Sequence, residues 1–283
     1  MAVFTNQAQL SYNNNVTNSN IAVGEILEVL SATKTAVRNE YGQNDTITYV
    51  ISIINSGNIA FTGLTVTDNL GEYAFGADVR IPLNYVDGTI QYYVNGVLQP
   101  VPTVTTGTEL VFSNINVPAN GNATLIYETQ VNQFAPLDAT GTITNEAVVA
   151  GGGLTPVTVT ETVTTVEAPF LTITKSISPV PVTENGILTY TFLIQNTGNA
   201  AATAADLAVI TDVFNPILTN LSVNFNGTAW TENVNYTYNE TTGEFVTVAG
   251  QITVPAATFT QDPATGAWNT NPGVSTLTIT GTI

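Results

Sequence analysis

The chain has 283 residues, enough for two ordinary domains with separate cores. Four basic residues stand against 21 acidic ones, and the net charge of −17 repels phosphate backbones and anionic lipid, so we expect neither a nucleic-acid nor a membrane partner. The absence of Cys and His excludes disulfides, thiolate metal sites and most familiar enzyme mechanisms, and we expect no metal and no other cofactor.

The N-terminal segment carries neither the basic region nor the apolar run of an export signal. No later stretch reaches the apolar length that a membrane span requires. We therefore expect that a signal was removed before this numbering, or that the protein leaves the cell by another route, such as lysis of a mother cell around a spore.

Short segments of alternating β-branched and aromatic residues follow one another along the chain, and helical periodicity is nearly absent. The strands expected from this pattern cover residues 46–54, 64–68, 89–94, 123–130, 155–166, 188–195 and 275–283. Turn-forming sequences rich in Asn and Gly separate them, at 55–58, 94–97, 120–122, 151–153 and 196–199. The sequence therefore predicts an all-β protein.

An internal repeat divides the chain into two similar halves. Thr33-Lys34-Thr35 returns 141 residues later as Thr174-Lys175-Ser176, and the same spacing relates Tyr49 to Tyr190 and the Asn-X-Gly-Asn turns at 55–58 and 196–199. A Thr-Asp pair ending at Asp68 returns 144 residues later, at Asp212. We predict a donor strand and linker at 1–23, a first domain at 24–168 and a second domain at 169–283.

These motifs, in this order, resemble the conserved-repeat domain of bacterial surface proteins known as domain of unknown function 11. The resemblance covers nearly the whole chain in two copies, each with the Thr-Lys pair, the Tyr, the Asn-X-Gly-Asn turn and the Thr-Asp pair. It implies two tandem Ig-like β-sandwich domains, display on a bacterial surface, structural or adhesive roles, and no established enzymatic activity.

The second domain is one strand shorter than the first at its C-terminal end. In the first domain a closing strand at 143–149 follows the penultimate strand at 123–130, whereas the matching penultimate strand of the second domain, at 276–283, reaches the last residue of the sequence. An incomplete sandwich leaves backbone groups and apolar side chains uncovered. We expect the acceptor edge at Leu277, Ile279 and Ile283.

A segment near the N-terminus has the pattern of the missing strand. The Thr-Asn-X-Ala motif of residues 144–147 is repeated within Phe4, Thr5, Asn6, Gln7, Ala8, Gln9 and Leu10. We predict that this donor strand completes the second domain of a neighbouring subunit, so that subunits add head to tail. Two alternatives remain open: the segment folds back onto its own second domain, or it is a disordered tail.

The only two lysines occupy the same position in the two repeats. Lys34 would lie near Asp68 and Asn145 in the first domain, and Lys175 near Asp212 and the neighbour's Asn6 in the second. These sets resemble the Lys, Asn and Asp/Glu groups of Ig-like surface domains that form isopeptide bonds, with Asp68 and Asp212 as acid/base helpers. Burial favours a neutral amine and a protonated carboxylic acid. The alternative is a buried ion pair with no covalent bond.

Together these patterns predict a structural subunit of an extracellular filament on a cell or spore surface, in which the protein's partner is itself. It would not be an enzyme beyond autocatalytic isopeptide formation. A second hypothesis is a surface adhesin or ligand-binding module using loops around 230–243 and their tryptophan. A hydrolase based on paired carboxylates has no support beyond the presence of Asp and Glu.

Overall fold

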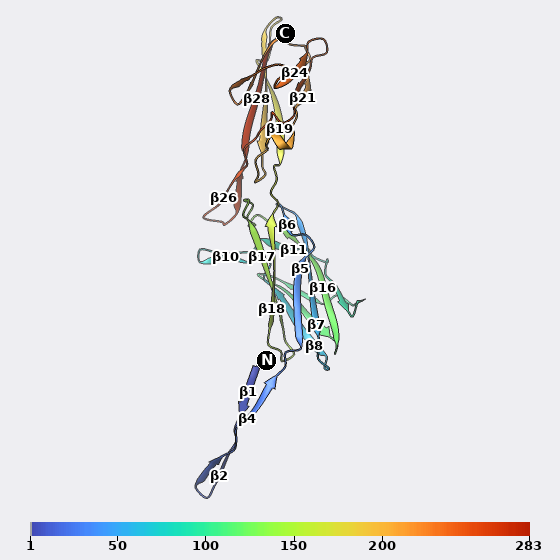
Figure 1. Cartoon of the computed structure of the whole chain (residues 1–283), viewed down its shortest axis with the longest axis vertical. Helices are drawn as coiled ribbons and strands as arrows, with labels where there is room; N and C mark the ends of the chain where they lie inside the picture. Colours follow the sequence, from blue (N-terminus) through green and yellow to red (C-terminus); the bar gives the residue numbers. More distant parts are fainter. Residues whose placement is uncertain (1) are drawn as a thin grey trace. The chain divides into compact units, whose positions relative to one another are not determined.

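The computed structural model describes residues 2–283, and the predicted N-terminal segment falls outside the described residues only at Met1. The described chain is all-β, apart from the single 3₁₀ turn η1 (Ala204–Asp206). It forms two compact units, one built by the chain up to Asn132 together with Ile143–Val163, the other by Gln133–Thr142 and Thr164–Ile283 (Figure 1).

Two six-stranded sheets make up the first unit. One has the order β13-β12-β16-β7-β5, with β11 also paired to β16; its strands are β5 (Leu30–Ala36), β7 (Thr46–Asn55), β11 (Leu83–Tyr85), β12 (Gln91–Val94), β13 (Val97–Leu98) and β16 (Gly121–Val131). The other has the order β14-β15-β8-β17-β18-β6; its strands are β6 (Glu40–Tyr41), β8 (Phe61–Asp68), β14 (Thr103–Thr106), β15 (Leu110–Val117), β17 (Thr142–Ala150) and β18 (Val157–Thr165). A small separate hairpin joins β9 (Tyr73–Phe75) and β10 (Asp78–Arg80).

Strict alternation along the strands creates the core of the first unit. In β7 the side chains of Ile47, Tyr49, Ile51 and Ile53 are fully buried, while the residues between them are partly or fully exposed. A strand places successive side chains on opposite faces, so this pattern directs one face of each sheet into the interior.

The second unit repeats this plan with fewer strands. Its larger sheet has the order β19-β20-β28-β22-β23 and contains β19 (Leu171–Ser178), β20 (Ile187–Asn196), β22 (Thr219–Phe225), β23 (Thr228–Trp230) and β28 (Gly273–Thr282). A three-stranded sheet has the order β21-β25-β24, from β21 (Thr211–Val213), β24 (Tyr236–Asn239) and β25 (Glu244–Thr247). A hairpin of β26 (Thr258–Gln261) and β27 (Trp268–Asn271) is separate.

Residues 2–26, which we call the N-terminal arm, form a hairpin of their own (Figure 1). Strand β1 (Ala2–Asn6) pairs with β4 (Ala22–Ile26), and β2 (Gln9–Tyr12) pairs with β3 (Asn15–Asn18). The sequence predicted a strand only over residues 4–10, followed by a linker. The returning strands β3 and β4 were missed, and the alternative of a disordered tail is wrong for the described part of the arm.

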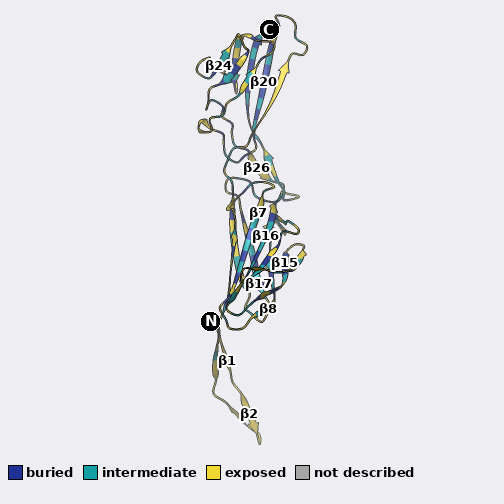
Figure 2. Ribbon diagram, turned by 90° about the vertical axis from the view of Figure 1, so that its right-hand side faces the viewer, coloured by how far each residue is buried: buried dark blue, intermediate teal, exposed yellow. Residues whose placement is uncertain are grey.

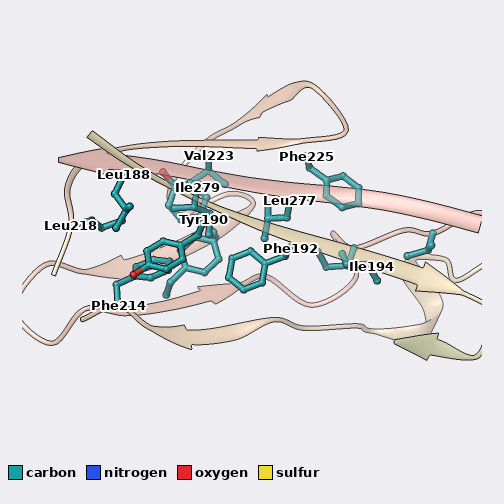
Figure 3. Packing of buried hydrophobic residues seen from close by; sticks show 14 of the residues in the cluster. Leu188, Tyr190, Phe192, Ile194, Phe214, Leu218, Val223, Phe225, Leu277 and Ile279 are labelled. Carbon is teal, nitrogen blue, oxygen red and sulfur yellow. The ribbon is translucent and has the colours of Figure 1, made fainter. Parts of the chain in front are cut away.

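The strands predicted between residues 46 and 283 are all present, as β7, β8, β12, β16, β18, β20 and β28. The predicted acceptor edge, however, is wrong. Strand β28 pairs with β20 on one side and β22 on the other, so it has no free edge. Leu277 and Ile279 point into the core beside Phe192 and Tyr190 (Figure 3), and both are fully buried.

Candidate functional site

Lys34 and Asp68 form a fully buried ion pair in the first unit. The Lys34 Nζ atom lies 2.6 Å from Asp68 Oδ2, and neither side chain is exposed to solvent. Lys34 comes from the edge strand β5 of one sheet and Asp68 from β8 of the other. The Tyr127 hydroxyl donates to the same carboxylate oxygen, and the Leu70 backbone N–H donates to the other at 2.8 Å. The Asp68 carboxylate therefore accepts hydrogen bonds from Lys34, Tyr127 and Leu70.

Asn145 is buried beside this pair on β17, the strand next to β8. Neither its Oδ1 nor its Nδ2 atom has a hydrogen-bond partner among residues 2–283. An unpaired buried amide costs about 1–3 kcal/mol and is rare in folded proteins, so such a group requires an explanation. A reacting carboxamide is one explanation.

Tyr49 connects the lysine to the amide. The Lys34 ammonium lies 4.9 Å from the centroid of the Tyr49 ring. Burial raises the pKa of Tyr49, as does the nearby Asp68 charge, while the Asn145 side chain has the opposite effect. No hydrogen bond joins the Asn145 amide to the Tyr49 hydroxyl. The amide nevertheless lies close enough to lower the pKa of that hydroxyl. Lys34, Asp68 and Asn145 thus share one enclosed environment.

Burial lowers the pKa of Lys34, because the charged ammonium loses its hydration. The charge and hydrogen bond of Asp68 act in the opposite direction and do not cancel the effect. The more distant charges of Glu146 and Glu161 contribute in the same sense as Asp68. A lowered lysine pKa increases the fraction of neutral amine, which is the nucleophilic form.

The second unit has the matching lysine and aspartate but leaves them accessible. Lys175 and Asp212 make a short contact, with side-chain exposures of 37% and 18%. The Lys175 ammonium lies 4.3 Å from the centroid of the Tyr190 ring, as Lys34 lies over Tyr49. The lysine, the aspartate and the tyrosine under the ammonium are therefore assembled in both units, whereas the second unit lacks the covering strand and has Ile279 in place of Tyr127.

The missing cover corresponds to strand β17. In the first unit β8 pairs with β15 on one side and β17 on the other. Among the described strands, its counterpart β21 pairs with β25 only. In the first unit the Asn69 N–H donates to the Glu146 carbonyl on β17 at 3.0 Å. The matching N–H, on Val213, bonds instead to the carboxylate of the preceding Asp212, at 2.9 Å. The edge of β21 is open.

Apolar side chains beside this open edge are exposed. All eight residues of β19 are exposed, among them Ile173 and Ile177, although β19 matches the half-buried β5. A hollow of about 150 Å³ lies between β19 and the chain entering β21. Its lining is almost entirely apolar: Leu171, Thr172, Ile173, Ile194, Ala208, Val209, Ile210 and Ile252. A cavity of this size holds benzene in an engineered protein, so it can accept an apolar side chain.

The arm carries the complementary surface. Apart from the partly covered Gly24, the residues of the arm whose burial is described are exposed to solvent. Figure 2 shows β1 and β2 in the colour of exposed residues. Phe4 and Leu10 are more than half exposed. Asn6, the predicted cross-link partner of Lys175, is exposed at the end of β1 opposite Ala22. Large exposed apolar residues of this kind mark interaction surfaces.

Neither the tryptophan of the adhesin hypothesis nor the described acidic side chains form a recognisable ligand site. Trp230, which the adhesin hypothesis used, stacks on Phe225 with ring centroids 4.9 Å apart, and so packs as a cross-strand partner. Within residues 2–283 no group of three acidic side chains is placed to hold a metal ion. No helix in that range is long and apolar enough to cross a membrane.

Three features of the site were not predicted from the sequence motifs. Tyr49 occupies matched positions in both repeats, and that recurrence was the available signal. Tyr127 had no such signal, because the residue opposite Tyr190 in the second unit is Ile279. The open edge at β21 was assigned to the wrong strand, because strand order within a sheet does not follow chain order.

Comparison with known proteins adds little. No protein-family model matches the sequence and no curated protein matches it, so membership of the domain of unknown function 11 stays a prediction. The solved structures that it matches include the pilus backbone RrgB of Streptococcus pneumoniae, with 10% identity, a TM-score of 0.36 and coverage of 86% of this chain and 55% of that one.

Two further matches are the major pilin subunit BcpA of Bacillus cereus and a collagen-binding domain from a Staphylococcus aureus adhesin. BcpA, in its D312A form, has 9% identity and a TM-score of 0.39, covering 96% of this chain and 73% of that one. The collagen-binding domain has 11% identity and a TM-score of 0.31, covering 50% of this chain and 99% of that one. At such low scores these likenesses support no functional assignment.

Proposed function

We propose that the protein is the structural subunit of an extracellular filament on a cell or spore surface, polymerising head to tail by strand donation. The N-terminal arm of one subunit would complete the second unit of the next. The observation that carries the proposal is the open edge of β21, at the place where β17 closes the first unit. The partner is a second copy of the chain.

The first unit supplies the expected register. There Ala147 lies opposite Asp68, and Val149 lies opposite Val66. The repeat spacings transfer these pairs to Ala8 opposite Asp212 and Leu10 opposite Ile210. Ile210 lines the hollow beside the open edge. Leu10 therefore replaces Val149, a fully buried residue in the first unit.

Strand donation would cover the exposed apolar side chains of the arm and the free edge of β21 at the same time. Full burial of a leucine or phenylalanine side chain contributes about 1.5–3 kcal/mol, and the arm offers Phe4 and Leu10. The free edge gains backbone hydrogen bonds, which give strand addition its affinity. Donor and acceptor are different surfaces of one chain, so each added subunit presents a new acceptor and the contact propagates.

The buried cluster supports a covalent lock in the first unit. A proton passes from the Lys34 ammonium to Asp68 across their 2.6 Å contact, leaving a neutral amine and a carboxylic acid. The Lys34 Nζ atom then attacks Cγ of Asn145, a Cγ–Nζ bond forms, and the Cγ–Nδ2 bond breaks. Asp68 gives its proton to the departing nitrogen, which leaves as ammonia, and then takes up the second proton that the Lys34 Nζ atom loses as the amide forms. The product is an amide joining β5 to β17.

The same chemistry would weld subunits together. When the neighbour's arm covers Lys175 and Asp212, it brings Asn6 to the position that Asn145 holds in the first unit. Attack of the Lys175 Nζ atom on Cγ of Asn6 releases one ammonia and joins two chains. Each cluster reacts once, so the reaction is maturation of the subunit and the protein does not act on other substrates.

A matched pair of arm variants tests the proposal. Leu10→Asp places a charge on the residue expected in the hollow, whereas Gln9→Asp places the same charge on its outward-facing neighbour. We expect Leu10→Asp to abolish filaments in electron micrographs and sedimentation, and Gln9→Asp to assemble as the wild type does. Both units should melt normally in both variants, because the arm belongs to neither sandwich. Normal filaments from Leu10→Asp would overturn the proposal.

A further inference from the structure

We infer that the donated element is the whole N-terminal hairpin, residues 2–26, which adds two strands to the neighbour's second unit. The inference rests on the proposed function and specifies its partner surface. A single donor strand would leave β3 and β4 as a linker outside the sheet. In the hairpin arrangement β4 becomes the second added strand.

The first unit shows what a complete sandwich contains. Beyond β8 its sheet continues through β17 and then β18, which form a hairpin with each other. In the second unit the matching sheet stops at β21. It therefore lacks counterparts of both β17 and β18, so the vacancy is two strands wide.

Chain order places the arm where the β17–β18 hairpin stands in the other repeat. The hairpin β17–β18 precedes β19, and the arm precedes β5. Strands β5 and β19 carry the matched Lys34 and Lys175. Each repeat thus begins with a hairpin and continues with a sandwich. The second hairpin closes the first sandwich within the chain, and the described strands of the first hairpin pair with neither sandwich of their own chain.

The two hairpins have the same register. In the arm Thr5 lies opposite Val23. In the first unit the hydroxyls of Thr144 and Thr162 are 2.9 Å apart across β17 and β18. Thr144 follows Thr5 by 139 residues, and Thr162 follows Val23 by 139 residues. A slip of one residue would reverse the faces of a strand, so equal registers preserve which side chains turn inward.

The connecting turns also coincide. Asn13 and Asn14 have φ angles of 44° and 65°. The residues 139 positions later are Gly152 and Gly153, with φ angles of 60° and 77°. Consecutive left-handed residues of this kind, rich in Asn and Gly, produce tight hairpin turns. The turn sequences of the arm and of the β17–β18 segment therefore each favour a hairpin.

Packing across the arm is adapted to the inward face. Ile143 and Val163 are both buried on facing strands of the first unit, and the matching arm residues are Phe4 and Gly24, which are paired in register. A Cβ atom added at Gly24 would collide with the ring of Phe4, so the phenylalanine ring occupies that space. In the arm, the large Phe4 and the small Gly24 therefore stand where the first unit has two side chains of medium size, Ile143 and Val163. An exposed two-stranded hairpin is only marginally stable alone, which favours its incorporation into a larger sheet.

A disulfide lock distinguishes hairpin from single-strand donation. The chain has no cysteine, so the double substitution Thr5→Cys and Val23→Cys introduces a single thiol pair on directly opposed residues. Both matching residues of the first unit are exposed, so the disulfide would lie outside the acceptor core. When glutathione disulfide has oxidised the variant, β1 and β4 are joined and cannot separate. When the variant is reduced, the two strands can separate.

Assembly is then compared by sedimentation in both redox states. Equal assembly of the oxidised and reduced variant is the expected result. Assembly of the reduced form alone would overturn hairpin donation while leaving strand donation intact. If neither form assembles, hydrogen exchange of wild-type filaments against Leu10→Asp monomers decides: we expect protection of residues 2–12 and 15–26 together. Protection of 2–12 alone would overturn the hairpin, and protection of neither segment would overturn the proposed function as well.

Discussion

Asp68 and Asp212 show how one missing strand changes the environment of the same residue. Each contacts a lysine of the same repeat position, and each lysine lies over a tyrosine ring. Asp68 is fully buried, whereas Asp212 retains 18% side-chain exposure beside the open edge. The chemistry we propose needs a dry cluster, so the first unit can react on folding and the second only on assembly.

Asn145→Ala should prevent the cross-link in the first unit. We expect the wild-type monomer to weigh one ammonia less than its sequence, and Asn145→Ala and Lys34→Arg to have their full sequence masses. Loss of a cross-link closing roughly a hundred residues should lower the free energy of unfolding by about 5 kcal/mol. Intact-mass spectrometry and chemical unfolding measure the two effects. Thr144→Ala, on the outward face of β17, is the control; a full-mass wild-type monomer would exclude this bond.

The buried tyrosines predict weakening of the first unit at alkaline pH. Burial raises the pKa of Tyr127, and the Asp68 charge and hydrogen bond act in the same direction. Above the unfolded value of about 10 the unfolded chain loses this proton while the folded chain keeps it, so stability falls as pH rises. In a chain without the Lys34–Asn145 bond, such as Asn145→Ala, the lowered pKa of Lys34 has the opposite sign: stability rises with pH up to about 10.4, the unfolded lysine value.

The difference between the wild type and Tyr127→Phe isolates this effect. Above pH 10.4 we expect the wild type to lose up to about 1.4 kcal/mol more per pH unit than the variant. Urea unfolding followed between pH 9 and 12 measures both slopes. Parallel slopes would show that Tyr127 ionises in the folded state as easily as in the unfolded state.

At the scale of elements, our proposal makes strand β21 the acceptor. Ile210 and Phe214 direct their backbone groups toward the β25 side, since the Ile210 carbonyl accepts from Thr247 and the Phe214 N–H donates to Gly243. The alternate residues Thr211 and Val213 therefore face the open edge. The Val213 N–H matches the Asn69 N–H that bonds to β17 in the first unit.

Val213→Pro should block assembly and leave the second unit folded. Proline removes the N–H that the donor requires, and edge strands tolerate proline because their outer groups carry no ladder bond. Val213→Thr keeps the N–H and is the matched control. We expect filaments from Val213→Thr, none from Val213→Pro, and melting temperatures within a few degrees of each other, by electron microscopy and calorimetry. Filaments from the proline variant would show that β21 is not the docking edge.

The sequence patterns predicted where the strands lie along the chain more completely than which strands lie side by side in the sheets. Alternation located β7, β16, β20 and β28, because half-buried strands enforce a period of two. The repeat spacing paired Lys34 with Asp68 and Lys175 with Asp212, and both contacts exist. The acceptor edge failed, because alternation states which face is buried and not which strand lies beside which. Strand β4 was missed, because Ala22–Ile26 is short and contains a glycine that resembles a turn signal.

At the scale of the whole molecule, one chain holds one unused hairpin and one incomplete sandwich. Within the chain, the second repeat's hairpin already closes the first repeat's sandwich. Assembly would extend the same relation to the next copy, so the filament needs no contact type that the monomer lacks. The proposed strand exchange and amide bonds, with no cysteine to reduce, would suit a structure outside the cell.

The most direct test of this account is a mixed cysteine cross-link between two subunits. Val148 lies opposite Thr67 in the first unit, so the repeat spacings place Gln9 of one subunit opposite Thr211 of the next. Gln9→Cys and Thr211→Cys subunits are mixed and oxidised, and the products are separated on a denaturing gel. The account predicts a disulfide-linked heterodimer joining residues 9 and 211, with no such product when Gln9→Cys is replaced by Gln7→Cys. Absence of the heterodimer from filaments that otherwise assemble normally would contradict donation of the arm to β21.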